Sequence, residues 1–113
     1  MTWTTYTDEN DEPVVRGPDG GVVIADEEHD FGARITLERL GEQEPFGITC
    51  GIYGWMMHSR FIETRGKAQA DYDAMKRDLA TIVEMIPLKS DRDVDLKMDK
   101  ASVAISAFVD RFP

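Results

Sequence analysis

The spacing of apolar residues changes once along this chain, and that change constrains the fold more than any other feature. Residues 33–40 alternate between apolar and polar side chains, which predicts a half-buried antiparallel strand. Across residues 67–86 the apolar side chains recur every three or four positions, which predicts an amphipathic helix that ends at Pro87. Strands followed by helices indicate an α+β domain, because a sheet with one apolar face needs a second layer to cover it.

We therefore predict an α+β fold with an antiparallel sheet of three to five strands within residues 2–64. Two helices follow, over residues 67–86 and 99–112, and both pack on one face of the sheet. Asp99 is the expected N-cap of the second helix. The length of 113 residues fits a single domain spanning 1–113, and the composition leaves open whether residues 1–12 form a flexible acidic segment.

Residues 46–64 are the strand with the most distinctive pattern, because its apolar face changes near Gly54. A β-bulge at Gly54 would bring both halves to one face, since a bulge adds one residue to one strand only. Without a bulge, the second half would be apolar on the opposite face. Both alternatives predict a bend near Gly54.

The negative charge is concentrated at the N-terminus. Residues 1–30 hold nine acidic residues and one basic residue, so they carry −8 of the net charge of −9. No positive surface is expected, which argues against nucleic acid and against anionic membranes as partners. A basic protein is the partner that such a charge attracts. The acidic residues that we expect to contact it are Asp8, Glu9, Asp11 and Glu12.

Large side chains crowd the segment from residue 53 to residue 60. Aromatic residues, methionine and arginine are enriched in the cores of protein interfaces. One hypothesis is that this segment anchors a partner or forms the seam of a homodimer, and the other is that it packs into the core. An alternative is a small-ligand or enzyme pocket between sheet and helices, where Arg60 holds an anion and His58 is the acid–base. The candidate residues are Tyr53, Trp55, Met56, His58 and Arg60.

Two further patterns bear on metal binding and on nucleophilic chemistry. Aspartates at every second position from Asp91 resemble the first half of a calcium-binding loop, with Asp91, Asp93, Asp95 and Asp99 as ligands. The turn glycine and the final glutamate of such a loop are missing, which favours a solvated connector with an optional short strand at 94–98. Cys50 lies between isoleucines of the same parity, which favours a buried, unreactive thiol.

No nucleotide, hydrolase or metal motif occurs in the sequence, so no cofactor is expected and a non-catalytic protein is favoured. Residues 1–10 have neither the basic nor the apolar region of a secretory signal, and the single cysteine suits a reducing compartment. We expect a cytoplasmic, acidic interaction or inhibitory domain. A small-ligand protein or enzyme with a pocket near residues 53–60 is the alternative.

Overall fold

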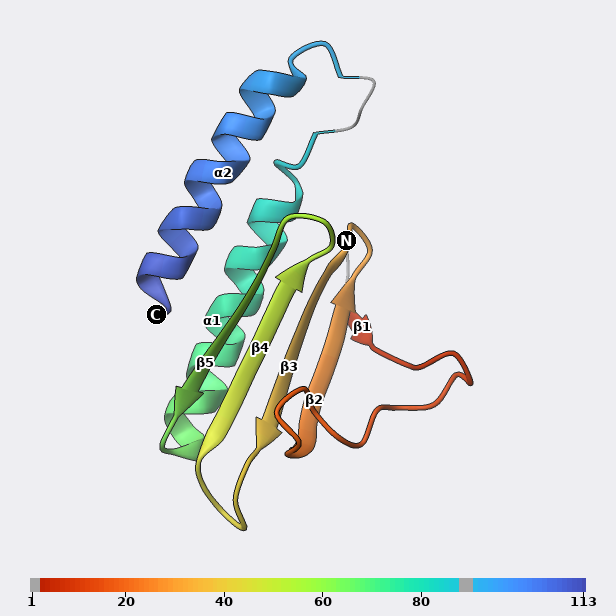
Figure 1. The fold of residues 1–113 in the computed structure, drawn as a ribbon, viewed down its shortest axis with the longest axis vertical. Coiled ribbons are helices and arrows are strands. Elements are labelled where there is room, and N and C mark those ends of the chain that lie inside the picture. Colours follow the sequence, from red (N-terminus) through yellow and green to blue (C-terminus); the bar gives the residue numbers. More distant parts are fainter. Residues whose placement is uncertain (1–2, 88–90) are drawn as a thin grey trace.

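A computed structural model describes residues 3–87 and 91–113. Five strands form one antiparallel sheet in the order β1-β2-β3-β4-β5, and two helices follow (Figure 1). The predicted α+β class and the order of sheet before helices are therefore confirmed. The elements are β1 (Trp3–Thr5), β2 (Val22–His29), β3 (Ala33–Arg39), β4 (Phe46–Ile52), β5 (Met56–Ile62), α1 (Arg65–Val83) and α2 (Val94–Arg111).

The hydrophobic core lies between one face of the sheet and α1, which runs across β3 and β4. The half-buried strand predicted from the alternating pattern is confirmed as β3. Ile35 and Leu37 point into this core, while their neighbours point to the opposite face. The apolar stripe of α1 covers them with Tyr72 and Met75, which are both buried. Within the described residues, no helix is long and apolar enough to cross a membrane.

The prediction of one strand over residues 46–64 is wrong, because β4 and β5 form a hairpin with its turn at residues 53–55. Gly54 does mark the change of direction, but the chain reverses there with a positive φ of 80° instead of bending through a bulge. The register runs without a slip from Phe46 opposite Ile62 to Ile52 opposite Met56. The change of apolar face near Gly54 in the sequence therefore arises because the chain reverses direction between β4 and β5.

The hairpin also decides which side chains of β5 face the helices. Paired positions in antiparallel strands share a face, so His58 faces the helices with Cys50, and Arg60 does so with Ile48. The intervening side chains point to the other face. Met57 is consequently 81% exposed.

The second helix begins earlier than predicted. It starts after Asp93, not at Asp99, so the expected connector and optional strand at 94–98 are helical. Acidic residues in a first helical turn interact favourably with the helix dipole, and Asp95 occupies that turn. The C-terminal half of α2 packs against the domain through Phe108 and Phe112, while the N-terminal half extends past the end of the sheet (Figure 1).

Candidate functional site

The face of the sheet opposite α1, which we call the open face, carries the candidate site. Among the described residues, no helix covers it. Instead, the segment of residues 6–21, which we call the N-terminal strap, runs back over part of it (Figure 1). Isolated bridges from Thr7 to Pro13 and from Arg16 to Val22 fold the strap onto itself and onto β2.

Glu38 of β3 fastens the strap to the open face. Its side chain is completely buried, and its carboxylate accepts hydrogen bonds from the backbone N–H groups of Asp19 at 3.2 Å and of Gly21 at 2.9 Å. A Cβ at Gly17 would lie 2.4 Å from Glu38 Oε2, so a larger residue there would force the carboxylate to move. A carboxylate on the solvent side of a strand is thus a structural anchor.

Arg34 makes the second attachment of the strap. Its guanidinium donates to both carboxylate oxygens of buried Asp26, at 2.9 and 2.7 Å, and Thr36 donates to the same carboxylate at 3.1 Å. The Tyr6 ring stacks on the guanidinium with its centroid 3.5 Å away. The hydrogen bond to Asp26 raises the pKa of Arg34, so the guanidinium stays positively charged in this contact.

A groove of about 850 Å³, which we call the sheet groove, lies on the open face between the strap and the β4–β5 hairpin. Tyr6 and Pro18 of the strap line one side of it, and the hairpin lines the other. Tyr53 is 92% exposed at its margin. Trp55, Met56 and Met57 also contribute to the lining, together with Glu28, Arg34, Thr49 and Gly51.

His58 and Arg60 are separated from this groove because they face the helices. The His58 Nε2 atom hydrogen-bonds to the backbone carbonyl of Phe112, and Arg60 forms an ion pair with Asp71 at 3.4 Å. Both side chains therefore tie the helices to β5. The suggested roles of Arg60 as anion holder and His58 as acid–base stay predictions: neither side chain lines the sheet groove, and the Nε atom of Arg60 is buried without a hydrogen-bond partner.

The acidic residues 8–12 lie in a tight turn at the tip of the strap. Asp8 Oδ1 accepts hydrogen bonds from the N–H groups of Asn10 and Glu12, at 2.8 and 3.1 Å. The side chains of Glu9, Asp11 and Glu12 are exposed. This tip projects beyond the β1–β2 side of the sheet, whereas β5 is at the other side (Figure 1). The structure thus separates the acidic tip from the second predicted set of interaction residues. In that set only Tyr53 is largely exposed, because Trp55 and Met56 pack against the core, and His58 and Arg60 face the helices.

The aspartates considered for calcium lie at the start of α2. Asp91 forms an ion pair with Lys97 at 3.2 Å, Asp93 is the N-cap residue, and Asp95 and Asp99 are inside the helix. A helix cannot wrap a cation as a calcium-binding loop does. Across residues 3–87 and 91–113, no three histidine, cysteine or carboxylate side chains are arranged to hold a metal ion.

Cys50 is buried among core side chains on the helix-covered face. Burial raises the pKa of its thiol to about 12, which leaves it protonated and unreactive at neutral pH. The expectation of a small buried side chain is confirmed.

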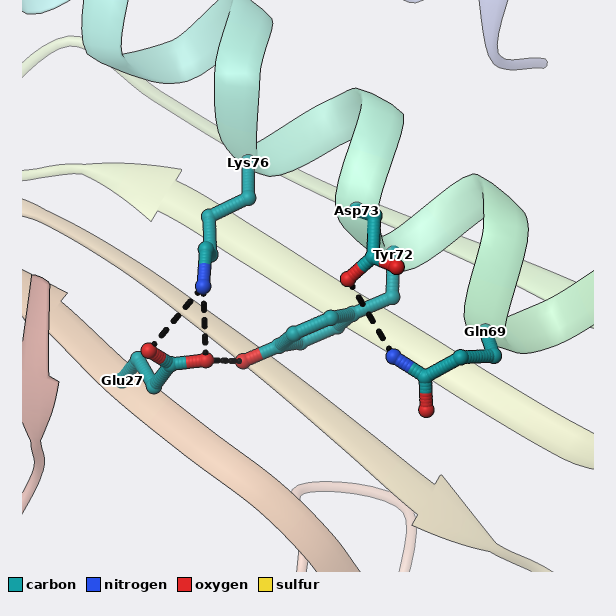
Figure 2. A network of polar contacts seen from close by, with 5 residues as sticks. All are labelled: Glu27, Gln69, Tyr72, Asp73 and Lys76. Carbon is teal, nitrogen blue, oxygen red and sulfur yellow. Dashed lines mark hydrogen bonds and ion pairs between the residues drawn. The ribbon is translucent and has the colours of Figure 1, made fainter.

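A polar network joins α1 to β2, and the sequence pattern did not reveal it. Tyr72 Oη donates to Glu27 at 2.7 Å, and the Lys76 ammonium contacts both oxygens of the same carboxylate at 3.1 Å (Figure 2). Burial is the main reason that the pKa of Tyr72 is raised, and its bond to Glu27 adds to the shift. Tyr72 and Lys76 lie four residues apart on one helix face, a signal that is visible in the sequence. Their partner Glu27 lies 45 residues from Tyr72, so no local sequence pattern identifies it.

Comparison of the chain with models of known protein families, with curated proteins and with solved structures finds no match.

Proposed function

We propose that this protein is a small, acidic, non-catalytic interaction or inhibitory domain that binds a basic protein partner over its open face. The observation that supports this most directly is the exposure of large apolar side chains on a sheet face that α1 leaves uncovered. Met57 and Phe61 are 81% and 62% exposed, and both lie on β5. Exposed apolar side chains in a group are typical of interaction sites.

The negative charges beside the open face support the proposal that the partner is basic. The exposed carboxylates of Glu9, Asp11 and Glu12 crowd one margin of the face, and Glu28 lies in the sheet groove between that margin and β5. A partner with lysine or arginine opposite these groups would be steered into contact, and salt would weaken that steering. Tyr53, Met57 and Phe61 then supply the desolvated anchors.

The experiment begins with capture of the partner on the tagged protein at low and at high salt, identified by mass spectrometry. The association rate with the purified partner is then measured for a variant with Asp8→Asn, Glu9→Gln, Asp11→Asn and Glu12→Gln. Asn at position 8 keeps the side-chain oxygen that accepts from Asn10, so the turn is retained. We expect association at least tenfold slower at low salt and little difference at high salt.

A matched control carries four amide substitutions at exposed carboxylates outside the strap: Glu42→Gln, Glu44→Gln, Glu63→Gln and Asp110→Asn. It has the same net charge as the first variant, so a slower rate in both would reflect total charge alone. Equal association rates for the strap variant and the parent would refute the proposal.

A small-ligand protein is the second candidate, and the sheet groove is the observation that favours it. Its volume of about 850 Å³ falls within the range of small-molecule sites, and Tyr6, Tyr53 and Arg34 combine aromatic surface with a fixed positive charge. Thermal-shift screening of a metabolite library against the parent and Tyr53→Ala would test it. A ligand that stabilises the parent but not the variant supports this candidate, and a screen without such a ligand counts against it.

A further inference from the structure

A second hollow lies away from the open face, where α2 diverges from α1. This helix groove has a volume of about 1340 Å³ and is bounded by α2, by the end of α1 and by the turn between β2 and β3. Figure 1 shows the N-terminal half of α2 rising past the end of the sheet on this side. The described part of the chain leaves the groove open.

The α2 wall of the groove is a single stripe on one face of the helix. Lys100, Val103, Ala104 and Ala107 line it at spacings of three or four residues, and Val103 is 71% exposed. The two alanines leave room for a second backbone to approach closely. Phe31 and the apolar residues at the end of α1, namely Val83, Met85 and Ile86, form the opposite wall.

Packing within the chain covers little of α2. Of its 18 residues only Ala101 and Phe108 are buried, and Leu96 and Met98 are also exposed near its start. Most of the stability of a protein helix comes from packing of its apolar face, so α2 has apolar surface to offer a partner.

The volume of the groove suits a helix better than a small molecule. Small-ligand sites span roughly 300–1,000 Å³, so this groove exceeds that range. A helix about 10 Å in diameter fills a similar volume in roughly three turns. Helices that bind in apolar grooves place side chains at spacings of three and four residues, which matches the stripe on α2.

The charged residues around the groove indicate which sign of charge its occupant carries. Its lining carries four carboxylates, at Asp30, Glu84, Asp91 and Asp99, and two lysines, at Lys97 and Lys100. The lining is therefore net negative, as is the whole chain at −9. A second copy of this chain would bring a further −9, which disfavours it as the occupant.

We propose that the helix groove binds an amphipathic helix of a partner protein whose apolar stripe is flanked by lysine or arginine. This site is on a different surface from the open face and does not depend on the function proposed above. The partner helix packs its apolar stripe against Val103 and Phe31, and its basic flanks lie near Asp30, Glu84 and Asp99.

Two synthetic helical peptides test the proposal. They share one leucine stripe at spacings of three and four residues, and their flanking positions are lysine in one and glutamate in the other. Binding to the full chain is measured by fluorescence anisotropy at low salt. We expect the lysine peptide to bind at least tenfold more tightly than the glutamate peptide, and Val103→Asp to weaken it at least tenfold.

The controls separate this groove from other surfaces. Leu96→Asp changes an exposed apolar residue of α2 outside the lining and should leave peptide affinity unchanged, as should Met57→Asp on the open face. Ala107→Trp, which fills the groove, is a second blocking variant, and circular dichroism checks that α2 still folds. A loss of binding in Met57→Asp would instead assign the peptide to the open face.

Three outcomes of the peptide experiments would overturn the proposal. They are absence of binding by the lysine peptide, equal binding of the two peptides, and binding that neither Val103→Asp nor Ala107→Trp weakens. Sedimentation velocity of the parent addresses a second copy as the occupant. A dimer that Val103→Asp converts to a monomer would also overturn the proposal.

Discussion

Removal of the Glu38 carboxylate should destabilise the protein far more than its place on the solvent side of a strand suggests. The side chain is 0% exposed and accepts from the N–H groups of Asp19 and Gly21. A hydrogen bond to a charged acceptor contributes about 1.5–3 kcal/mol, and part of that gain offsets the cost of burying the charge. We therefore expect Glu38→Ala to lower the free energy of unfolding by roughly 2–4 kcal/mol.

Two comparisons isolate the hydrogen bonds from other effects. Glu38→Gln keeps the shape and one acceptor oxygen, so its cost should be about 1 kcal/mol. Glu42→Ala removes an exposed carboxylate in a turn and should change stability by less than about 0.5 kcal/mol. Urea unfolding gives the three values, and the m-value shows whether unfolding stays two-state.

Amide hydrogen exchange reports whether the strap alone detaches. In Glu38→Ala the amides of Asp19 and Gly21 should exchange faster than in the parent, because they lose their acceptor. If Glu38→Ala has the same free energy of unfolding as the parent, and these two amides exchange at the same rate in both, Glu38 does not anchor the strap and the reasoning fails.

Four other substitutions test the contact between α1 and β2, the buried thiol and the local backbone conformations. Tyr72→Phe removes one donor to Glu27 and should cost about 1–2 kcal/mol in urea unfolding; a cost near zero would show that the network does not hold α1 to β2. Burial raises the pKa of Cys50 from 9.0 to about 12, so its contribution to stability is complete below pH 9 and is lost as the pH rises toward 12. Stability of the parent should therefore fall more steeply above pH 9 than that of Cys50→Ala, by up to about 1.4 kcal/mol per pH unit, and parallel curves would contradict the burial of the thiol. Gly54→Ala should cost about 1 kcal/mol in the same assay because of the positive φ, whereas Gly66→Ala in the first turn of α1 should stabilise; a neutral Gly54→Ala would argue against the turn conformation.

The elements that could be predicted from the sequence are those whose pattern is local. The alternation over 33–40 and the helical spacing over 67–86 each depend on side chains within one element, and both appear in the structure as β3 and α1. The bounds of α1 differ by two residues at the start and three at the end, since helix ends depend on local capping.

The hairpin cannot be told from a bulge in the sequence, because both change the apolar pattern of the strand in the same way. Both shift the parity of the apolar residues, and only the pairing of Ile52 with Met56 distinguishes them. The consequence for the candidate site is large, because the reversal places Met57 on the open face and turns His58 toward the helices. Gly54 indicates a turn, but a glycine alone does not distinguish a bend in one strand from a full reversal of the chain.

The attachments of the strap could not be predicted from local patterns at all. Glu38 meets Asp19 across 19 residues, and Glu27 meets Lys76 across 49. In the sequence, Glu38 and Glu27 look like ordinary polar residues of strands. Only the three-dimensional arrangement shows that one anchors the strap and the other anchors α1.

The most direct test of binding over the open face is the pattern of amide hydrogen exchange in the protein alone and in complex with its captured partner. We expect exchange to slow across the hairpin turn and β5, at residues 53–62, and in the strap at residues 6–21. The buried interior of α1, which is protected in both states, serves as the internal reference. Unchanged exchange at residues 53–62 in a saturated complex would contradict the proposed function.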